Sequence, residues 1–316
     1  MIFNFEKASQ PTLYFIGVTT GKSSIMKVFP KWADALELKD VAIKGIDLVR
    51  PSSAPQYRKV VEFIKNDPLS LGALVTTHKI DLYNACKDLF DYIDPYAMML
   101  SEVSCLSKRD GKFCAHAKDP ISSGLSIEAF MPKDFWKNHG GEAILIGAGG
   151  SSLAMILYFA QERHKDNIPK KVVLCNRSES RLISAKEHLE SIENRFPIEY
   201  KLTPMSDGAK AIDKLIANAP PYSLIVNATG LGKDAPGSPT SDAVVYPMNS
   251  LVWEINYRGD LIFMYQAQAQ EKERNLHIED GWIYFIHGWT QVISEVFNIK
   301  IEGELLDKLS DIAQNT

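Results

Sequence analysis

A glycine-rich turn between two apolar runs is the segment of this 316-residue chain best suited to chemistry. The apolar run 143–146 ends in the turn, a helical pattern follows, and a second apolar run occupies 172–175. The turn contains Gly147, Gly149, Gly150 and Ser151. Glycines allow the backbone to approach a pyrophosphate, and free N–H groups at a helix start face the anion. The order strand, turn, helix, strand therefore predicts that these four residues bind a dinucleotide.

The end of the second apolar run predicts which dinucleotide is bound. An acidic side chain there would bind the ribose 2′-OH of NAD, but this chain has Asn176, Arg177 and Ser178, with Arg181 one turn on. Cationic and hydroxyl groups suit a 2′-phosphate, so the expected cofactor is NADP. The glycines alone would equally fit a tight turn without a ligand, and Ser152 replaces the third glycine of the usual fingerprint. The flanking strands and the basic second turn favour binding.

Two residues of the first half are suited to exchanging protons with a substrate. Lys79 lies just past a predicted strand, after Thr76, Thr77 and His78, and sites in α/β proteins gather where strands end. A lysine can move a proton to or from an alcohol when its surroundings favour the neutral amine. Asp119 follows another predicted strand. The local sequence fits a solvated loop lysine and a helix-capping aspartate equally well, and it favours a His78 side chain that faces solvent.

Composition limits the classes of protein to which the chain can belong. It carries 35 Lys and Arg against 39 Asp and Glu, a formal net charge of −4, which predicts no general attraction to nucleic acid or to anionic membranes. The four cysteines have no paired spacing, so we expect reduced thiols, a cytoplasmic protein and no metal site. No apolar run approaches the ~18 residues of a membrane span. The expected partner is a small-molecule substrate, bound by a monomer or homodimer.

The elements that must position these residues alternate along the chain. Strands are predicted at 13–18, 41–49, 71–75, 143–146, 172–175, 223–227 and 251–255, and helices at 26–38, 56–66 and 122–131. Residues 102–107 and 113–117 fit a hairpin around Asp110-Gly111. This order predicts an α/β fold with parallel sheets covered on both faces. We expect an N-terminal α/β substrate domain over 1–125 and a Rossmann-type, doubly wound domain over 126–279, with the helical residues 280–316 packing back on the first domain.

Several of these motifs together resemble those of the shikimate dehydrogenase family. Val75-Thr-Thr-His-Lys79 is similar to the family's Val-Thr-x-Pro-x-Lys, and Ala117-Lys-Asp119 to its Asn-Thr-Asp. The glycine turn at 147–150 and the Asn-Arg-Ser segment at 176–178 match the family's NADP signature. Val226-Asn-Ala-Thr229 resembles its Asn-Ala-Thr strand end, and Glu254-Ile-Asn-Tyr257 its Asp-x-x-Tyr element. The similarity spans residues 13 to 300.

The resemblance implies a role for each matching residue. Lys79 would be the catalytic lysine and Asp119 its partner. Asn227 and Thr229 would lie beside the nicotinamide half of the cofactor. The residues implied to bind the substrate are Ser23, Ser24, Thr76, Ser104, Tyr257 and Gln291.

The differences from the family's motifs lie mainly in the segments that bind the substrate in that family. The family's Ser-x-Ser-Pro loop becomes Gly21-Lys-Ser-Ser-Ile25, its substrate-binding asparagine becomes Ser104, and the threonine of Asn-Thr-Asp becomes Lys118. The glutamine of the last helix aligns with Gly288, with Gln291 as a candidate substitute, and the lysine motif lacks its proline. Changing the polar partners of a site built for ring hydroxyls costs ~10⁴ or more in discrimination. We therefore expect that shikimate is not preferred. The two introduced lysines would suit a more anionic substrate or else point to solvent.

The chain is thus expected to be an NADP-dependent oxidoreductase that interconverts a secondary alcohol and a ketone on a small, polar, alicyclic hydroxy acid. A quinate- or aminoshikimate-type dehydrogenase is the alternative within the same class. From another class, a non-catalytic NADP(H)-binding sensor need not keep both Lys79 and Asp119. A folate dehydrogenase would share the lysine but fits Asp119 and the Asn-Arg-Ser segment less well.

Overall fold

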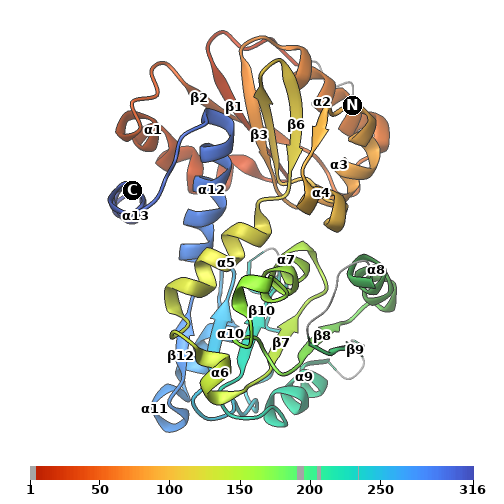
Figure 1. The fold of residues 1–316 in the computed structure, drawn as a ribbon, viewed down its shortest axis with the longest axis vertical. Coiled ribbons are helices and arrows are strands. Elements are labelled where there is room, and N and C mark those ends of the chain that lie inside the picture. The colour runs from red at the N-terminus through yellow and green to blue at the C-terminus, as the bar shows by residue number, and fades with distance from the viewer. Residues whose placement is uncertain (1–4, 191–195, 205–207, 234) are drawn as a thin grey trace. The chain divides into compact units, whose positions relative to one another are not determined.

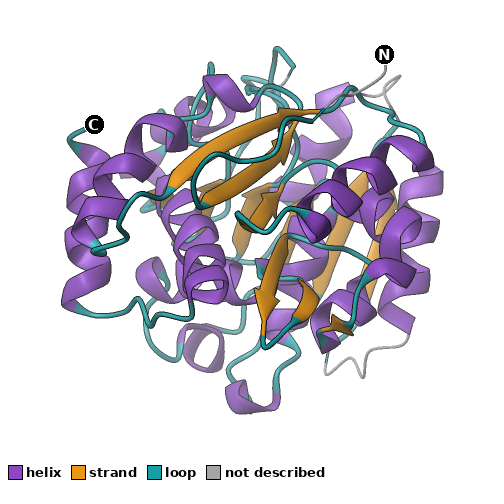
Figure 2. Cartoon of the chain, turned by 90° about the horizontal axis from the view of Figure 1, so that it is seen from above, coloured by secondary structure: helices purple, strands orange, loops and turns teal. Residues whose placement is uncertain are grey.

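The computed structural model describes residues 5–190, 196–204, 208–233 and 235–316, and the chain forms two compact units (Figure 1). Unit 1 comprises residues 1–118 and 288–316, and unit 2 comprises residues 119–287. Each unit has one six-stranded sheet against which helices pack (Figure 2). None of the helices in the described ranges combines the length and the apolar character that crossing a membrane requires.

The sheet of unit 1 is mixed, and its strand directions place the candidate residues at one edge. Its strands are β1 (Thr12–Gly17), β2 (Ala42–Asp47), β3 (Ser70–Val75), β4 (Tyr92–Ile93), β5 (Cys105–Arg109) and β6 (Lys112–His116), in the order β2-β1-β3-β5-β6-β4. β1 is parallel to β2 and β3, whereas β5 is antiparallel to both β3 and β6. The carboxyl ends of β1, β3 and β6 therefore share an edge. From that edge leave the segments that contain Ser23, Lys79 and Lys118.

The helices of unit 1 cover this sheet through amphipathic faces. They are α1 (Ile25–Ala35), α2 (Ala54–Asn66), α3 (Lys79–Cys86), α4 (Pro95–Leu100), α13 (Glu304–Gln314) and the short 3-10 helices η1 (Thr20–Lys22) and η2 (Lys87–Leu89). Helix α2 begins with a capping box between Ser53 and Gln56 and buries four side chains against the sheet, those of Tyr57, Val60, Val61 and Ile64. Near the C-terminus, α13 is tied to α1, because the Trp32 indole N–H donates to the Leu309 carbonyl at 2.7 Å.

The sheet of unit 2 is parallel throughout. Its strands are β7 (Ala143–Ile146), β8 (Val172–Asn176), β9 (Ile198–Leu202), β10 (Leu224–Asn227), β11 (Leu251–Glu254) and β12 (His277–Glu279), in the order β12-β11-β10-β7-β8-β9. Strands β7, β10 and β11 are buried along their whole length, as the continuous apolar runs of covered parallel sheets require. The turns that follow β7, β8, β10 and β11 leave from one edge.

The helices of unit 2 cover its sheet or connect its strands. They are α5 (Asp119–Phe130), α6 (Phe135–His139), α7 (Gly150–Phe159), η3 (Glu162–His164), α8 (Glu179–Glu190), α9 (Gly208–Ala217), α10 (Ile262–Gln268) and α11 (Glu271–Arg274). Helix α12 (Trp282–Phe297) begins in unit 2 and ends in unit 1. Helices α5 and α7 pack closely through Gly124.

The α/β fold expected from the sequence is confirmed, and so is the hairpin, whose turn residues Asp110 and Gly111 both have positive φ. Three strands were not predicted: the edge strands β4, β9 and β12. The domain limits at 125 and 279 remain predictions. Residue 125 lies within α5, and residue 279 ends β12.

Replacing Gly124 with alanine tests the close packing of α5 on α7. A Cβ at this position would lie 2.4 Å from the ring of Tyr158, and overpacking of this kind costs ~1–3 kcal/mol. This loss should outweigh the gain in helix propensity of about 1 kcal/mol. We expect Gly124→Ala to lower the free energy of unfolding in urea titrations. The matched control is Gly288→Ala in α12, where a Cβ meets no atom within 4 Å and where the change should stabilise. Equal effects of the two substitutions would contradict the packing described.

Candidate active site

The glycine turn of unit 2 has the shape that a dinucleotide requires. Gly147 has a φ of +110°, and a Cβ there would lie 2.8 Å from the Ala228 carbonyl oxygen, so glycine is needed. A Cβ on Gly149 would meet no atom within 4 Å, which leaves open space in front of Gly150, the first residue of α7. The N–H groups of a first helical turn lack intrahelical partners and bind anions. The residues present therefore fit a pyrophosphate.

Two serines complete this turn. The Ser152 hydroxyl donates to the Gly147 carbonyl, which explains how a serine can occupy the place of the third glycine. Ser151 accepts a hydrogen bond from the Tyr284 hydroxyl at 3.3 Å. Tyr284, at the start of α12, therefore lies beside the candidate phosphate site.

The end of β8 carries the residues expected to select the cofactor. The Oδ1 atom of Asn176 accepts from the backbone N–H of Ala148 at 3.5 Å, and its Nδ2 donates to the Ser178 carbonyl at 3.2 Å. Asn176 thereby ties the strand end to the glycine turn. Arg177 and Arg181 are exposed at this strand end, where no carboxylate occupies positions 176–178. Such a pair of guanidinium groups suits a phosphate monoester.

A buried carboxyl group joins the ends of β10 and β11. Glu254 is 1% exposed; it accepts from the Asn227 side chain at 2.6 Å and from the backbone and side chain of Asn256 at 2.9 and 2.7 Å. Asn227 in turn accepts from the backbone N–H and hydroxyl of Thr229, at 3.1 and 2.6 Å. Burial raises the pKa of the Glu254 carboxyl to about 7, although bonds from Asn256 and Asn227 lower it. Asn227 and Thr229 are thus held rigidly by one carboxyl group.

In unit 1, the chain turns sharply between β3 and Lys79. The backbone N–H of Thr76 donates to the Ile16 carbonyl at 3.0 Å, and that of His78 donates to the Thr76 carbonyl at 2.5 Å. Lys79 is the first residue of α3, and its own carbonyl accepts from the backbone N–H of Val103 at 3.2 Å. These bonds fix the backbone of Lys79 at the carboxyl edge of the sheet.

The expectation that His78 faces solvent is wrong. Its side chain is 0% exposed and lies within hydrogen-bond distance of the Tyr57 hydroxyl, at 2.8 Å, and of the Leu48 carbonyl, at 3.1 Å. Burial lowers the pKa of His78, against the opposing effect of its bond to Leu48. Both partners lie more than twenty residues away in the chain, 21 and 30 residues respectively. For that reason the local sequence carries no sign of this burial.

The residues that precede Asp119 are held by polar groups from other parts of unit 1. The Asp94 carboxylate accepts from the backbone N–H of Ala117 at 3.1 Å, and the buried Ser104 hydroxyl accepts from that of Lys118 at 2.7 Å. Asp119 itself is 7% exposed and begins α5. Ser104 therefore supports the backbone next to Asp119. Whether it also binds substrate, as the family resemblance implies, remains a prediction.

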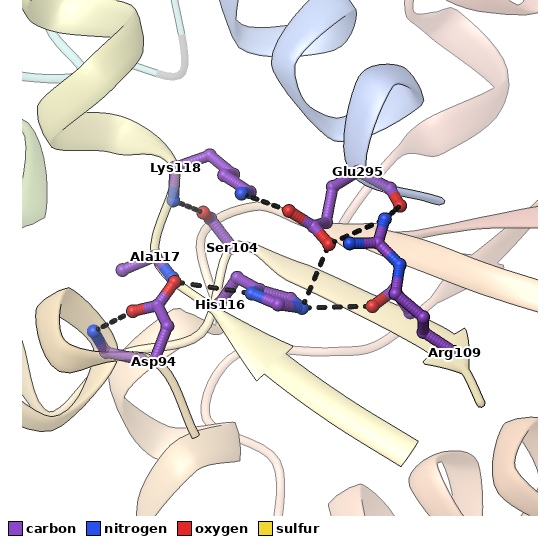
Figure 3. Close-up of polar contacts among 9 residues, drawn as sticks. Asp94, Ser104, Arg109, His116, Ala117, Lys118 and Glu295 are labelled. Carbon is purple, nitrogen blue, oxygen red and sulfur yellow. Dashed lines mark hydrogen bonds and ion pairs between the residues drawn. The ribbon is translucent and has the colours of Figure 1, made fainter. Parts of the chain in front are cut away.

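Lys118 is part of a half-buried charge cluster, whose contacts Figure 3 shows. Its Nζ donates to a Glu295 carboxylate oxygen at 2.5 Å, and its side chain is 13% exposed. The other carboxylate oxygen lies 3.1 Å from Arg109 Nη2 and 3.6 Å from His116 Nε2. Burial alone would raise the pKa of the Glu295 carboxyl, but the bond from Lys118 and the charges of His116, Lys118 and Arg109 hold it below its usual range. Lys118 does not lie in solvent, whereas Lys22 is exposed, so one of the two lysines fits the solvent interpretation. A more anionic substrate stays a prediction.

The other residues implied to bind substrate divide between the units. Ser23 is buried after η1, and Ser24 is half-buried directly before α1. Tyr257 is half-buried in unit 2, and its ring packs on Phe285 with the centroids 4.7 Å apart. Gln291 is half-buried on α12, one turn before Glu295 and on the same helical face. Sequence reasoning thus placed Ser23, Thr76, Lys79 and Ser104 in segments that do meet at one sheet edge.

Glu295 was missed by sequence reasoning, and Glu254 was named only as the first residue of the Asp-x-x-Tyr resemblance, without a role. Glu295 is the one Asp, Glu, Lys or Arg residue in the sequence of α12, Trp282–Phe297. Glu254 directly follows the apolar residues Leu251, Val252 and Trp253. Charged side chains are almost never fully buried unless they are paired. A single carboxylate in an apolar element was therefore the available sign of a buried polar partner.

The pH dependence of stability tests the description of Glu254. Its pKa is about 7 in the folded chain against 4.5 for an ordinary glutamate, so ionisation should cost the folded state up to about 3 kcal/mol. This cost is absent below pH 4.5, grows as the pH rises to 7 and is constant above that. The variant Glu254→Gln should therefore gain stability relative to the native chain between pH 5 and pH 8 in thermal unfolding. The exposed control Glu162→Gln should show a constant difference, and a constant difference for Glu254→Gln would contradict the buried-carboxyl description.

No family model matches the chain. In sequence, it is 26% identical over 184 residues to the shikimate dehydrogenase (NADP(+)) of Streptococcus thermophilus, which covers 58% of this chain and 59% of that protein. It is also 26% identical over 192 residues to the shikimate dehydrogenase (NADP(+)) of Lactococcus lactis, covering 60% of this chain and 61% of that one. The matched segments thus span about three fifths of these relatives, less than two thirds of their length.

In fold, the chain is similar to a quinate dehydrogenase from Corynebacterium glutamicum in complex with NAD. The two share 18% sequence identity with a TM-score of 0.72, over 97% of this chain and 99% of that one. At this identity the likeness shows the fold alone. The chain is thus similar in sequence to shikimate dehydrogenases and in fold to a quinate dehydrogenase.

Proposed function

We propose that the chain is an NADP-dependent oxidoreductase that interconverts a secondary alcohol and a ketone on a small, polar, alicyclic hydroxy acid. The observation that carries this proposal is the turn at Gly147 and Gly149, whose conformation and open space fit a pyrophosphate. The exposed Arg177 and Arg181 at the end of β8 support NADP over NAD. The sequence relatives named as NADP(+)-dependent shikimate dehydrogenases support the same choice.

In this proposal the bound cofactor supplies the hydride chemistry, and the chain positions the reactants and moves the proton. The Lys79 amine exchanges the proton of the substrate hydroxyl, as a positioned acid–base group. The Asp119 carboxylate orients Lys79 and binds a neighbouring hydroxyl. Gly147, Gly149 and the start of α7 hold the pyrophosphate, while Asn227 and Thr229 form a rigid strand end for the nicotinamide half.

The residues that replace the family's substrate-binding residues are evidence against shikimate as the preferred substrate. Lys118 stands in place of the family threonine, and its charge is compensated by Glu295, so it supplies no unpaired cation for an additional anionic group. At Gly288 a glycine replaces the family glutamine, and a Cβ there would meet no atom within 4 Å. We therefore propose an alicyclic acid whose polar groups differ from those of shikimate. Quinate or an aminoshikimate is the first candidate, and an NADP(H) sensor without turnover is the alternative from another class.

Reversing one charge at the end of β8 tests the cofactor assignment. Each charge-assisted bond to a 2′-phosphate contributes ~1.5–3 kcal/mol, so Arg177→Asp should weaken NADP binding at least ~10-fold and improve NAD binding in relative terms. Calorimetric titration of both cofactors measures this. The control Lys186→Asp makes the same charge change farther along α8 and should leave the preference unchanged. Equal affinities of the unaltered protein for NADP and NAD would refute the assignment.

The proposed reaction is tested by screening shikimate, quinate and other alicyclic hydroxy acids for NADP reduction, followed by substitution of Lys79. Loss of the amine in Lys79→Ala should lower kcat by ~10²–10⁴, the range for a positioned acid–base group. The NADP affinity should be preserved, because the candidate cofactor residues lie in unit 2 and Lys79 lies in unit 1. The control Lys87→Ala removes an exposed lysine just beyond the same helix.

Three outcomes separate the alternatives. NADP binding without turnover of any acid would favour the sensor. Turnover that survives in Lys79→Ala would remove the proposed proton-transfer role. A kcat/KM for shikimate near ~10⁵ M⁻¹s⁻¹ or above, a value usual for a dedicated enzyme, would show that the substitutions at Ser104, Lys118 and Gly288 do not exclude it.

A further inference from the structure

The buried His78 ring is held at both of its nitrogen atoms. Its Nδ1 lies 2.8 Å from the Tyr57 hydroxyl, and its Nε2 lies 3.1 Å from the Leu48 carbonyl oxygen. Tyr57 comes from α2 and is 1% exposed, and Leu48 follows β2 and is also 1% exposed. The ring therefore connects three separate segments of unit 1 inside the protein.

The two contacts determine the tautomer of His78. A carbonyl oxygen can only accept, so Nε2 must carry the proton that is donated to Leu48. Nδ1 is then an acceptor, and the Tyr57 hydroxyl donates to it. A neutral ring with this tautomer satisfies both contacts at once. The direction in which burial moves the pKa of His78, downward, agrees with a ring that stays neutral.

The residue directly before His78 has a strained backbone. Thr77 has a φ of +61°, and the His78 N–H donates to the Thr76 carbonyl across it. An i to i+2 hydrogen bond with positive φ at the central residue defines the rarer and more strained of the two γ-turns. Positive φ is unfavourable for a β-branched residue such as threonine. Conformations of this kind persist when the surrounding structure over-determines them, and they cluster at functional sites.

The strained turn and the held ring converge on one residue. Lys79 follows His78 directly, and its carbonyl is fixed by the Val103 N–H. If the ring served only to fill the core, an apolar side chain would do so without the cost of burying two polar atoms. The hydrogen bonds of His78 instead hold the end of the γ-turn at the point where α3 begins.

We propose that His78, held by the Tyr57 hydroxyl, is a positioning residue for the Lys79 amine. The strained turn at Thr77 aims the start of α3, and the two bonds of the His78 ring keep the turn in that conformation. This proposal rests on the proposed function, because a kcat can be measured only if the chain turns over a substrate. The placement of the Lys79 amine itself can be measured without turnover.

Two conservative substitutions remove the bond between Tyr57 and His78, although Tyr57→Phe also removes the hydrogen bonding of the hydroxyl to Ser52. Tyr57→Phe deletes only the hydroxyl. In His78→Gln the amide nitrogen can still donate to the Leu48 carbonyl, while no acceptor remains at the position of Nδ1, because the amide oxygen lies at the end of the side chain. The matched control is Tyr14→Phe, which deletes another buried hydroxyl from the same core. Each variant is first checked for an unchanged circular dichroism spectrum, so that loss of folding is not mistaken for loss of positioning.

The first measurement separates kcat from KM with the best acid found in the screen. Small misplacements of a catalytic group cost up to ~10²-fold in rate, so kcat should fall about 10- to 100-fold in Tyr57→Phe and in His78→Gln. The KM values for the acid and for NADP should stay within about twofold. Tyr14→Phe should retain the native kcat. A change in KM alone would overturn the proposal.

The second measurement does not depend on activity. Reductive methylation with ¹³C-formaldehyde labels the lysine amines, and the Lys79 signal in ¹H–¹³C spectra is identified by its absence in Lys79→Arg. The proposal expects this signal to move or broaden in Tyr57→Phe and His78→Gln but not in Tyr14→Phe. A Lys79 signal that is unchanged in both variants would overturn the proposal even if no substrate is ever found. A moved signal in a protein without turnover would support the positioning role and count against the proposed function alone.

Discussion

Buried polar groups must find hydrogen-bond partners inside the protein, and this constraint shapes the strand ends that carry several of the candidate site residues. Glu254 and His78 are buried and Glu295 is half-buried, and an unpaired carboxylate or imidazole in the protein interior would cost several kcal/mol. Each is instead bonded to at least one group from a segment distant in the sequence. The loops at the strand ends take their conformations from these bonds. The turns that carry Lys79, Lys118 and Thr229 are therefore rigid parts of the fold.

The two units meet this constraint in different ways. In unit 2 the turn after β7 relies on glycines, on the N-terminus of α7 and on the Ser152 hydroxyl, so few side-chain identities matter there. In unit 1 the strand ends are held by pairs of side chains, such as Lys118 with Glu295. A buried pair can be exchanged only as a pair, because either charge alone would be left without compensation.

The sequence predicted the elements whose signals are local. The strands around the glycine turn, the hairpin at Asp110-Gly111 and the helix over 122–131 all appear, within a few residues of their predicted limits. Strand β9 was missed because its side chains are only partly buried and carry a Glu and a Lys. Strand β12 was missed because it has only three residues. The burial of His78 and the pairing of Lys118 escaped prediction for another reason: their partners lie 21 and 177 residues away.

The pairing of Lys118 also shows why single aligned positions are a poor guide to substrate. Read alone, a lysine in place of a threonine adds a charge and suggests a more anionic ligand. Read with Glu295, Arg109 and His116, it shares one carboxylate with a second cation, so the charge that it adds is partly compensated inside unit 1. The fold does not resolve the question, since proteins named for shikimate and for quinate share it with this chain. A lysine that replaces a neutral residue therefore has to be interpreted together with its ion-pair partners before its charge is assigned to a ligand.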